Sequence, residues 1–396
     1  MMIKKIADLI TSNAQTTGVS RWKANSKPTF SRIGKRSLEG TEIPPALAGW
    51  FFIFCVFISS NAFAQKDVIS EVFFKINNEY VENMSNKDIT LKGLRALLNI
   101  DKDLTLRRSQ NKVFLYYKNQ KYKEFDFPQN ENDIKAWVEF NKNVMNEAIK
   151  TSPLVEVHDF ELEDRFAQKV FEGLDGYSHY FGAFDDKDEN KPLKIRRHYA
   201  ARLVDDFLLI RLIRFQKDTA EKIKESVGEC SKCKGLILDL RGNKGGFINE
   251  AIKIAGLFLD EGIVTYTQAS ENSTPQYYTA PAGDILSNKP MAILIDGATA
   301  SAAEILAAAL SEQNRAVLIG TKTYGKGAVQ DVEKIGSDRA ISVTTSFFYT
   351  PSGLNIDKKG LTPFICTGLT EDCEKEDRFD KEEDIERAVK YLKTGI

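Results

Sequence analysis

The chain has 396 residues, of which 42% are hydrophobic and 28% charged, and its 55 basic side chains are balanced by 56 acidic ones. At roughly 150 residues per domain, this length accommodates two or three globular units whose stability requires neither metals nor disulfides, and it excludes a single small module. The balanced charge argues against a nucleic-acid partner, and three histidines in the whole chain argue against a histidine-rich metal site.

An apolar run occupies residues 46–58, follows basic residues and precedes an Ala-x-Ala site that ends at Ala64. A run of this length is too short to span a bilayer, which takes about 20 residues. The pattern predicts a signal peptide over residues 1–64, with a long basic leader and cleavage after Ala64, and therefore a periplasmic or other extracytoplasmic location. A buried helix or an uncleaved anchor, which would bring membrane association, is the alternative.

Four cysteines follow that segment, namely Cys230, Cys233, Cys366 and Cys373. In an oxidising compartment they predict two disulfides, for which three pairings are possible, and two local loops are the favoured pairing. A zinc site built from both pairs is the alternative.

The first predicted elements form an N-terminal domain, residues 65–190, with a small β-hairpin insert. Helical spacing of apolar residues predicts helices, and alternation predicts two or three short strands. The expected helices cover 67–84, 89–100, 133–151 and 159–174, the last capped by Asp159, and the expected strands lie within 103–127. A charged loop at 184–192 marks the predicted boundary.

Residues 191–396 are predicted to form a separate α/β core, because strands and helices alternate there. Expected strands lie at 206–215, 235–240, 291–295 and 316–319, and expected helices at 218–228, 248–258 and 301–311, the first capped by Asp218. Such a sheet is parallel and covered on both faces, with its active site at the carboxyl ends of the strands.

Two of these strand ends carry unusual loops. Residues 239–246 (DLRGNKGG) contain a glycine turn that can present N–H groups to a ligand, although a plain tight turn explains it equally well. Ser301 lies where the next helix begins, a position at which free N–H groups stabilise negative charge. Ser301 and Glu304 also have the spacing of a capping box, so Ser301 could simply cap that helix.

A third loop supplies a candidate base. Lys326 stands between two glycines, and Gln330 follows it on a predicted strand. A serine nucleophile needs a base, and no histidine follows His198. A lysine serves when it is neutral, a state that burial among apolar neighbours favours. Lys322 is a competing lysine without the flanking glycines.

Taken together, these segments resemble the carboxyl-terminal processing (tail-specific) serine protease family over residues 206–365. The resemblance rests on DLRGNKGG, GATASAAEI, GKGAVQ, YTPSG and KGLTP in this order, with Lys326 25 residues after Ser301, and a fainter similarity occurs in DGYSHY at 175–180.

The resemblance implies a fold and a set of roles. The fold is α/β, with a crotonase/ClpP-like αβ core, an N-terminal helical arm and a small β insertion. Ser301 is implied as the nucleophile, Lys326 as the general base and Gln330 as the residue that orients it. The oxyanion hole is implied to consist of the N–H groups of Ala302 and of Gly245 or Gly246, with Glu312 in a supporting position. No cofactor and no metal are implied.

The sequence departs from the family pattern in three places. Lys244 stands where the family has glycine, and residues 100–157 form an unfamiliar insert. Only some 25 residues separate Phe181 from Phe207, where many members carry a PDZ domain, so recognition of free carboxyl-terminal tails by that module is in doubt. Relatives that lack PDZ domains, such as the nisin-resistance type, exist in the wider family.

The resulting hypothesis is an exported serine endopeptidase that uses a Ser-Lys dyad on protein or peptide substrates. One rival is a catalytically silent peptide-binding or scaffolding protein with the same fold. Another is a crotonase-type acyl-CoA enzyme, which the predicted signal peptide contradicts.

Overall fold

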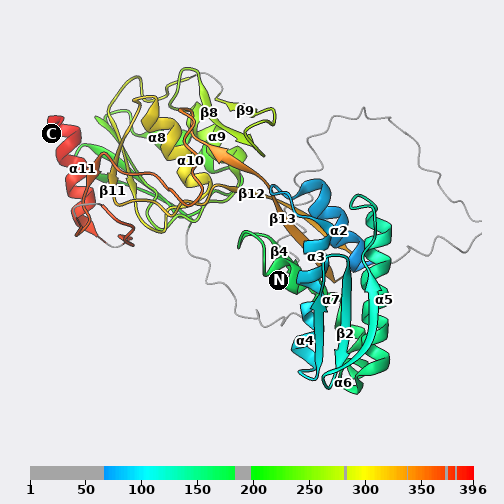
Figure 1. The fold of residues 1–396 in the computed structure, drawn as a ribbon. Coiled ribbons are helices and arrows are strands. Elements are labelled where there is room, and N and C mark those ends of the chain that lie inside the picture. Colours follow the sequence, from blue (N-terminus) through cyan, green and yellow to red (C-terminus); the bar gives the residue numbers. More distant parts are fainter. Residues whose placement is uncertain (1–66, 183–197, 281–282, 337, 371–372, 380) are drawn as a thin grey trace, which may run out of the picture.

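The computed structural model describes residues 67–182, 198–280, 283–336, 338–370, 373–379 and 381–396. Two lobes lie side by side, an N-terminal lobe (residues 67–182) and a C-terminal lobe (the described residues from 198 onward) (Figure 1). The predicted signal peptide and the predicted domain boundary both lie outside the described residues.

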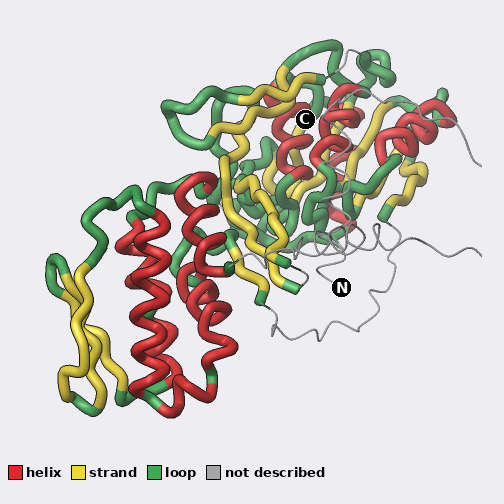
Figure 2. The backbone as a smooth tube through the Cα atoms, turned by 90° about the vertical axis from the view of Figure 1, so that its right-hand side faces the viewer, coloured by secondary structure: helices red, strands yellow, loops and turns green. Residues whose placement is uncertain are grey.

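The N-terminal lobe packs helices against a small antiparallel sheet, as Figure 2 shows from the side. Its helices are α2 (Val68–Glu79), α3 (Asn86–Gly93), α4 (Arg95–Ile100), α5 (Ile134–Thr151), α6 (Pro153–Val157) and α7 (Leu162–Phe171). Its sheet has the order β1 (Leu104–Arg108), β2 (Lys112–Tyr117) and β3 (Gln120–Asp126). The predicted strands are therefore confirmed, as is the helix from Ile134, where Asp133 accepts a hydrogen bond from the N–H of Ala136.

The helix predicted over residues 159–174 is confirmed over a shorter range, α7 (Leu162–Phe171), but the predicted cap at Asp159 is wrong. Asp159 starts a 3-10 turn, η1 (Asp159–Glu161), and makes no capping hydrogen bond to the helix that follows. That helix, α7, begins only at Leu162 and ends two residues before Gly173, a residue type that favours helix ends.

The C-terminal lobe is built on a six-stranded sheet. Its order is β14 (Ile365–Cys366), β11 (Val317–Gly320), β10 (Met291–Ile295), β7 (Gly235–Asp239), β6 (Phe207–Leu212) and β5 (Tyr199–Val204). Neighbouring strands from β14 to β6 run parallel, and β5 pairs antiparallel with β6 at the edge. The predicted parallel layer is confirmed.

Helices cover both faces of this sheet. Alternate strand residues such as Leu238 and Ile293 form one core with α8 (Thr219–Glu229), α9 (Ile248–Gly256) and α10 (Ala302–Glu312). The intervening residues, such as Ile237 and Leu294, form another with α11 (Glu382–Thr394). This two-residue alternation explains why the strands read as continuous apolar runs.

The predicted cap of α8 is wrong. Asp218 has the left-handed conformation (φ 67°) in place of the extended backbone that a capping residue adopts, and its side chain makes no capping hydrogen bond.

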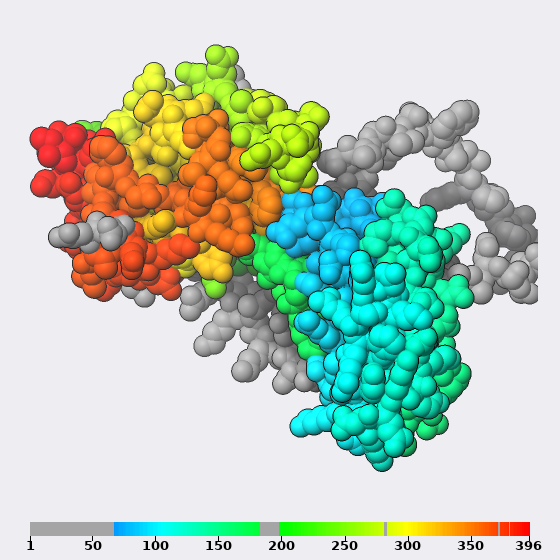
Figure 3. Space-filling model, viewed as in Figure 1, coloured from blue at the N-terminus to red at the C-terminus, as the bar shows by residue number. Residues whose placement is uncertain are grey.

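A further sheet joins the two lobes. Its order is β12 (Ala328–Ile335), β13 (Arg339–Tyr349), β8 (Ile263–Gln268) and β9 (Gln276–Thr279), and β4 (His179–Phe181) also pairs with β13. Ile341 near the start of β13 belongs to the core of the N-terminal lobe, and Phe348 near its end to that of the C-terminal lobe. The space-filling view shows this orange hairpin meeting the blue α2 where the lobes join (Figure 3).

Two disulfides close the local loops, Cys230 with Cys233 and Cys366 with Cys373, as the favoured pairing predicts. Within the described part of the chain, no helix has both the length and the apolar character needed to cross a membrane.

Candidate active site

Ser301 occupies a strained backbone position at the carboxyl edge of the six-stranded sheet. Strand β10 ends at Ile295, and a short loop leads to Ser301, the residue that caps α10. Its φ of 59° and ψ of −122° lie in a region that residues with a Cβ rarely adopt. Such strain persists only where the surrounding structure enforces it, and it concentrates at functional sites.

Asp296 holds this loop against the glycine turn. The carboxylate is fully buried, and its Oδ1 accepts the N–H groups of Gly242 at 2.9 Å, Thr299 at 3.0 Å and Ala298 at 3.1 Å. The loops that follow β7 and β10 therefore share one carboxylate, which fixes the glycine turn beside Ser301.

The structure distinguishes the two candidate glycines. A Cβ on Gly245, which has φ +92°, would stand 2.9 Å from the Cβ of Ser301, so glycine is required for this close approach. The N–H of Gly245 already donates to Oδ1 of Asn243 at 2.9 Å. In contrast, the N–H groups of Gly246 and Ala302 have no hydrogen-bond partner among the described residues.

Glu304 joins the serine segment to the lysine loop. Its Oε2 accepts the N–H of Ser301 and the N–H of Lys326, both at 2.9 Å. Its Oε1 accepts the N–H of Gly325 at 2.7 Å and the hydroxyl of Thr323 at 2.5 Å. Glu304 thus does more than cap α10. One of its carboxylate oxygens accepts the main-chain N–H of both Ser301 and Lys326, and so holds the two segments side by side.

The pKa of Glu304 is raised, because burial penalises its charge. The hydrogen bonds from Thr323 and from the N–H groups of Lys326, Gly325 and Ser301 act in the opposite direction. The site therefore contains a fully buried carboxylate whose compensation comes from hydrogen bonds rather than from a cation.

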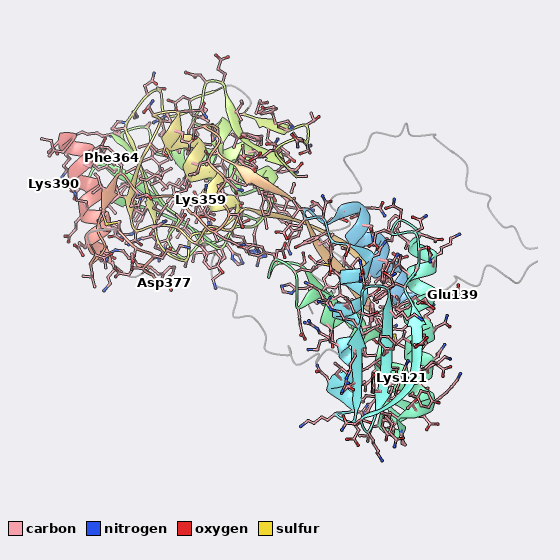
Figure 4. All side chains as sticks on the ribbon, viewed as in Figure 1. Lys121, Glu139, Lys359, Phe364, Asp377 and Lys390 are labelled. Carbon is pink, nitrogen blue, oxygen red and sulfur yellow. A yellow bond between two sulfur atoms is a disulfide. The ribbon has the colours of Figure 1, made fainter. Side chains whose placement is uncertain are left out.

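The glycines on either side of Lys326 are explained by a neighbouring chain segment. A Cβ on Gly325 would stand 2.8 Å from the N of Gly360, and one on Gly327 would stand 2.5 Å from the N of Asp357. Figure 4 labels Lys359 in this segment of the C-terminal lobe. Close backbone contact with residues 357–360 thus holds the lysine loop in place.

Lys326 itself is half-buried, and its Nζ lies 6.0 Å from the centre of the Tyr177 ring. Among the described residues, no hydrogen bond joins its Nζ to Ser301 or to Gln330. The structure therefore brings Lys326 close to the serine segment, but no hydrogen bond joins the side chains of Lys326 and Ser301.

Gln330 faces the N-terminal lobe. Its Nε2 donates to the main-chain oxygen of Tyr177 and, at 3.2 Å, to the hydroxyl of Ser342. A bulge between Val329 and Gln330 redirects β12 at this point. Its orienting role toward Lys326 stays a prediction.

Glu312 lies at the opposite end of α10 from Ser301. Its carboxylate accepts the N–H of Ser352 at 2.7 Å and the hydroxyl of Ser352 at 2.9 Å. It fixes the turn of the YTPSG segment, about 16 Å along the helix from the serine.

Two functional candidates were not assigned from the sequence. Glu304 was considered only as a capping partner, although its apolar surroundings in AAEILAAA signal burial. Tyr177 lies in the DGYSHY segment, whose turn is held by Asp175 through the N–H groups of Tyr177 and Ser178. Only the fold shows that this turn reaches Gln330 and Lys326.

The region that carries Ser301 and Lys326 is similar to known proteins. Residues 206–366 match Peptidase family S41. The carboxy-terminal-processing protease of Bartonella bacilliformis is 37% identical over 170 residues, which are 41% of this chain and 39% of that protein. The chloroplastic carboxyl-terminal-processing peptidase 2 of Arabidopsis thaliana is 36% identical over 156 residues, covering 39% of this chain and 30% of that protein.

Among solved structures, a photosystem II D1 C-terminal processing protease is 31% identical, with a TM-score of 0.39, over 40% of this chain and 42% of that one. The domain at residues 206–366 is thus of the serine-type peptidase class. More narrowly, this part of the chain is similar to carboxyl-terminal processing proteases. The match spans less than two fifths of the length of either curated relative named above.

Proposed function

We propose that this protein is an exported serine endopeptidase with Ser301 as nucleophile and Lys326 as general base. The observation that carries the proposal is the carboxylate of Glu304, which accepts the main-chain N–H of both residues at 2.9 Å. A residue that only capped α10 would not also bind the main chain of the lysine loop through the same carboxylate oxygen.

In the proposed reaction, the Ser301 hydroxyl attacks the scissile carbonyl carbon while neutral Lys326 accepts its proton. The resulting oxyanion receives hydrogen bonds from the free N–H groups of Ala302 and Gly246, at the start of α10 where the helix dipole also favours negative charge. Gly245 contributes by its close packing, because its own N–H is engaged by Asn243.

Collapse of the intermediate breaks the C–N bond, and Lys326 passes its proton to the leaving amine. Water then attacks the acyl-enzyme while Lys326 accepts its proton. Lys326 returns that proton to the Ser301 oxygen as the acyl–oxygen bond breaks, and the product leaves with a new carboxyl group. We assign Gln330 to orienting Lys326 and Glu312 to supporting the site through the Ser352 turn.

The location and the domain organisation are further parts of the proposal. The disulfides Cys230–Cys233 and Cys366–Cys373 support an oxidising, extracytoplasmic compartment, in line with a signal peptide over residues 1–64. The parallel sheet with α10 against one face supports a crotonase/ClpP-like core. The substrate class is protein or peptide.

The test compares hydrolysis of a fluorogenic peptide library by wild-type protein and by Ser301→Ala and Lys326→Ala. Both variants should keep their circular dichroism spectra and fall below about one thousandth of wild-type activity. Matched controls are Ser311→Ala, in the last turn of α10, and Lys334→Ala, exposed on β12; both should hydrolyse the library as wild type does.

Labelling by a fluorophosphonate separates this proposal from a silent scaffold. Wild type should be labelled and Ser301→Ala should not. Peptide binding without labelling or hydrolysis in the wild-type protein would support the scaffold instead, and full activity in either active-site variant would remove the mechanism.

A further inference from the structure

Lys244 is a charged residue in the middle of the glycine turn that packs on Ser301. Its neighbours on both sides are buried, whereas Lys244 itself is exposed. The main-chain oxygen of Asn243 accepts the N–H of Ala300 at 2.9 Å, and a Cβ on Gly245 would stand 2.9 Å from the Cβ of Ser301. Because consecutive Cα atoms are about 3.8 Å apart, the Lys244 backbone lies within about 8 Å of the Ser301 side chain. The contacts that build the turn therefore hold this cation beside the proposed nucleophile.

The charge of Lys244 has no counter-charge within the described part of the protein, where its side chain makes neither an ion pair nor a hydrogen bond. The acidic side chains around the turn are engaged elsewhere. Asp239 pairs with Arg241 at 2.8 Å, Asp296 is buried and accepts main-chain N–H groups, and Glu304 is buried with four donors of its own. A free ammonium on a flexible stem is thus left at the site, where it can pair with a charge from outside.

A second segment with exposed positive charge lies along the same turn. Phe215 is buried, and its main-chain N–H donates to the glycine turn at 3.2 Å. Arg214 and Lys217, on either side of this contact, are exposed and make no ion pair with a described residue. Asp218 follows, and its charge acts on Lys253 of α9. Together with the lysine of the turn, the exposed side chains here comprise three cations and one carboxylate, so this side of the site attracts anions.

We propose that Lys244 selects substrates that carry an acidic side chain within about three residues of the scissile bond. The scissile carbonyl oxygen binds the free N–H groups of Gly246 and Ala302, so the peptide passes beside the turn on which Lys244 is exposed. A glutamate or aspartate there pairs with the ammonium, and the like charge of Arg214 adds to the attraction. The preference in cleavage rests on the proposed function of Ser301, whereas binding of an acidic peptide does not.

The preference should be modest and sensitive to salt, because an exposed ion pair contributes at most about fivefold in affinity. The substrate and the transition state carry the same charge beside Lys244, so the effect should fall on KM and leave kcat in place. It should decline as NaCl is raised from about 0.05 M to about 0.5 M, since salt screens exposed charges. An apolar contact would not decline in this way.

The kinetic test starts from one fluorogenic peptide that the wild-type protein cleaves. In six derivatives, glutamate replaces a neutral residue at each of the three positions on either side of the scissile bond, and six matched peptides carry glutamine there. We expect at least one position at which wild type cleaves the glutamate peptide with about fivefold higher kcat/KM than the glutamine peptide.

Charge reversal assigns this preference to Lys244. Lys244→Gln should bring the ratio of kcat/KM for glutamate over glutamine close to 1, and Lys244→Glu should bring it below 1 and favour a lysine peptide. The control is Lys390→Gln, an exposed lysine on α11, which covers the other face of the sheet (Figure 4); it should keep the wild-type ratio. A ratio near 1 at all six positions in wild type, or a wild-type ratio in Lys244→Gln, overturns the proposal.

Binding separates failure of this subsite from failure of the peptidase. The full chain carrying Ser301→Ala is titrated, by fluorescence anisotropy, into a twelve-residue peptide with a central pair of glutamates and into its glutamine counterpart. The glutamate peptide should bind about fivefold more tightly, and Lys244→Gln in the same protein should remove the difference. Equal binding, with wild type cleaving both peptide series alike, contradicts the acidic preference alone. Absence of cleavage contradicts the proposed function, and the ratio of the two affinities then decides whether Lys244 binds an acidic side chain.

Discussion

Glu304 and Lys326 are joined by a hydrogen bond of 2.9 Å from the main-chain N–H of the lysine to Oε2 of the glutamate. The same oxygen accepts the N–H of Ser301 at the same distance. A residue buried in α10 therefore sets the separation between the segments that carry the proposed nucleophile and base. Catalysis by a serine and a lysine depends on that separation, because proton transfer requires hydrogen-bond reach.

Replacing the buried carboxylate with an amide should uncouple these segments. Glu304→Gln keeps the shape but converts one acceptor oxygen into a donor, leaving either the Ser301 and Lys326 pair or the Gly325 and Thr323 pair of donors unsatisfied. We expect kcat to fall about 100-fold and the free energy of unfolding to fall by about 1–3 kcal/mol. Steady-state kinetics and urea denaturation measure the two effects.

The control for this change is Glu261→Gln, at an exposed position, which should alter neither quantity. Wild-type kcat in Glu304→Gln would show that the shared oxygen does not position the site.

Gly245 provides a steric test of the glycine turn. In Gly245→Ala the new methyl group would stand 2.9 Å from the Cβ of Ser301 and 3.0 Å from the carbonyl oxygen of Ala300. The matched control is Gly336→Ala, where φ is also positive (+68°) but nothing lies within 4 Å. Both variants carry the backbone strain of alanine at positive φ, about 1 kcal/mol, and only Gly245→Ala adds a clash.

We therefore expect both variants to lose some stability and only Gly245→Ala to lose activity, by at least about tenfold in kcat/KM. Fluorogenic peptide hydrolysis beside thermal unfolding separates the two effects. Equal activity in the two variants would argue against close packing of the turn on Ser301.

Much of the C-terminal lobe follows from local patterns. The strands β7 and β10 are short, nearly uninterrupted apolar runs, and the glycine turn and Ser301 follow directly after them, so that their meeting at one sheet edge was predictable. The spacing of Ser301 and Lys326 was informative because it matches the pattern of the family that these segments resemble.

The joining hairpin and the role of Glu304 were not predictable in the same way. Strand β13 pairs with β4 at one end and β8 at the other, partners more than 70 residues away along the chain, and periodicity does not reveal such pairings. Ser-x-x-Glu has the same spacing whether its glutamate is exposed or buried, so the four donors to Glu304 appear only in the fold. Asp218 is the opposite case. Aspartate is a common capping residue, but the left-handed backbone of Asp218 keeps its side chain from capping α8.

Tyr177 forms a wall beside the proposed base. Its ring lies 6.0 Å from Nζ of Lys326, and its main-chain oxygen receives the amide of Gln330. Burial, together with the hydrogen bond to Asp357 and the charge of that carboxylate, raises the pKa of the Tyr177 hydroxyl, which therefore stays protonated at neutral pH.

Removing this ring should leave the lysine side chain without its neighbour and loosen its position beside the serine segment. In Tyr177→Ala we expect kcat/KM to fall about tenfold or more, without a matching loss of thermal stability. Tyr177→Phe keeps the ring and should keep wild-type kcat/KM. The exposed Tyr122→Ala is the control. Wild-type kcat/KM in Tyr177→Ala would show that the ring does not position the site.

Asp175 should make the turn that holds Tyr177 sensitive to acid. Burial alone would raise the pKa of this carboxyl, but the hydrogen bonds from Thr344, Ser178 and Tyr177 outweigh it and place the pKa below its ordinary value of 3.8. A depressed pKa in the folded state means that Asp175 stabilises the fold above pH 3.8 and that this contribution is lost as the pH falls through the lower, folded-state value.

The stability difference between wild type and Asp175→Asn should therefore be constant from about pH 5 to 7 and shrink below about pH 4. Urea denaturation at a series of pH values measures it, with the exposed Asp260→Asn as control. Activity should follow the same course, since Tyr177 and Gln330 depend on this turn. A stability difference that stays constant down to pH 3, or that grows on acidification, would contradict a carboxylate that the folded protein stabilises in its charged form.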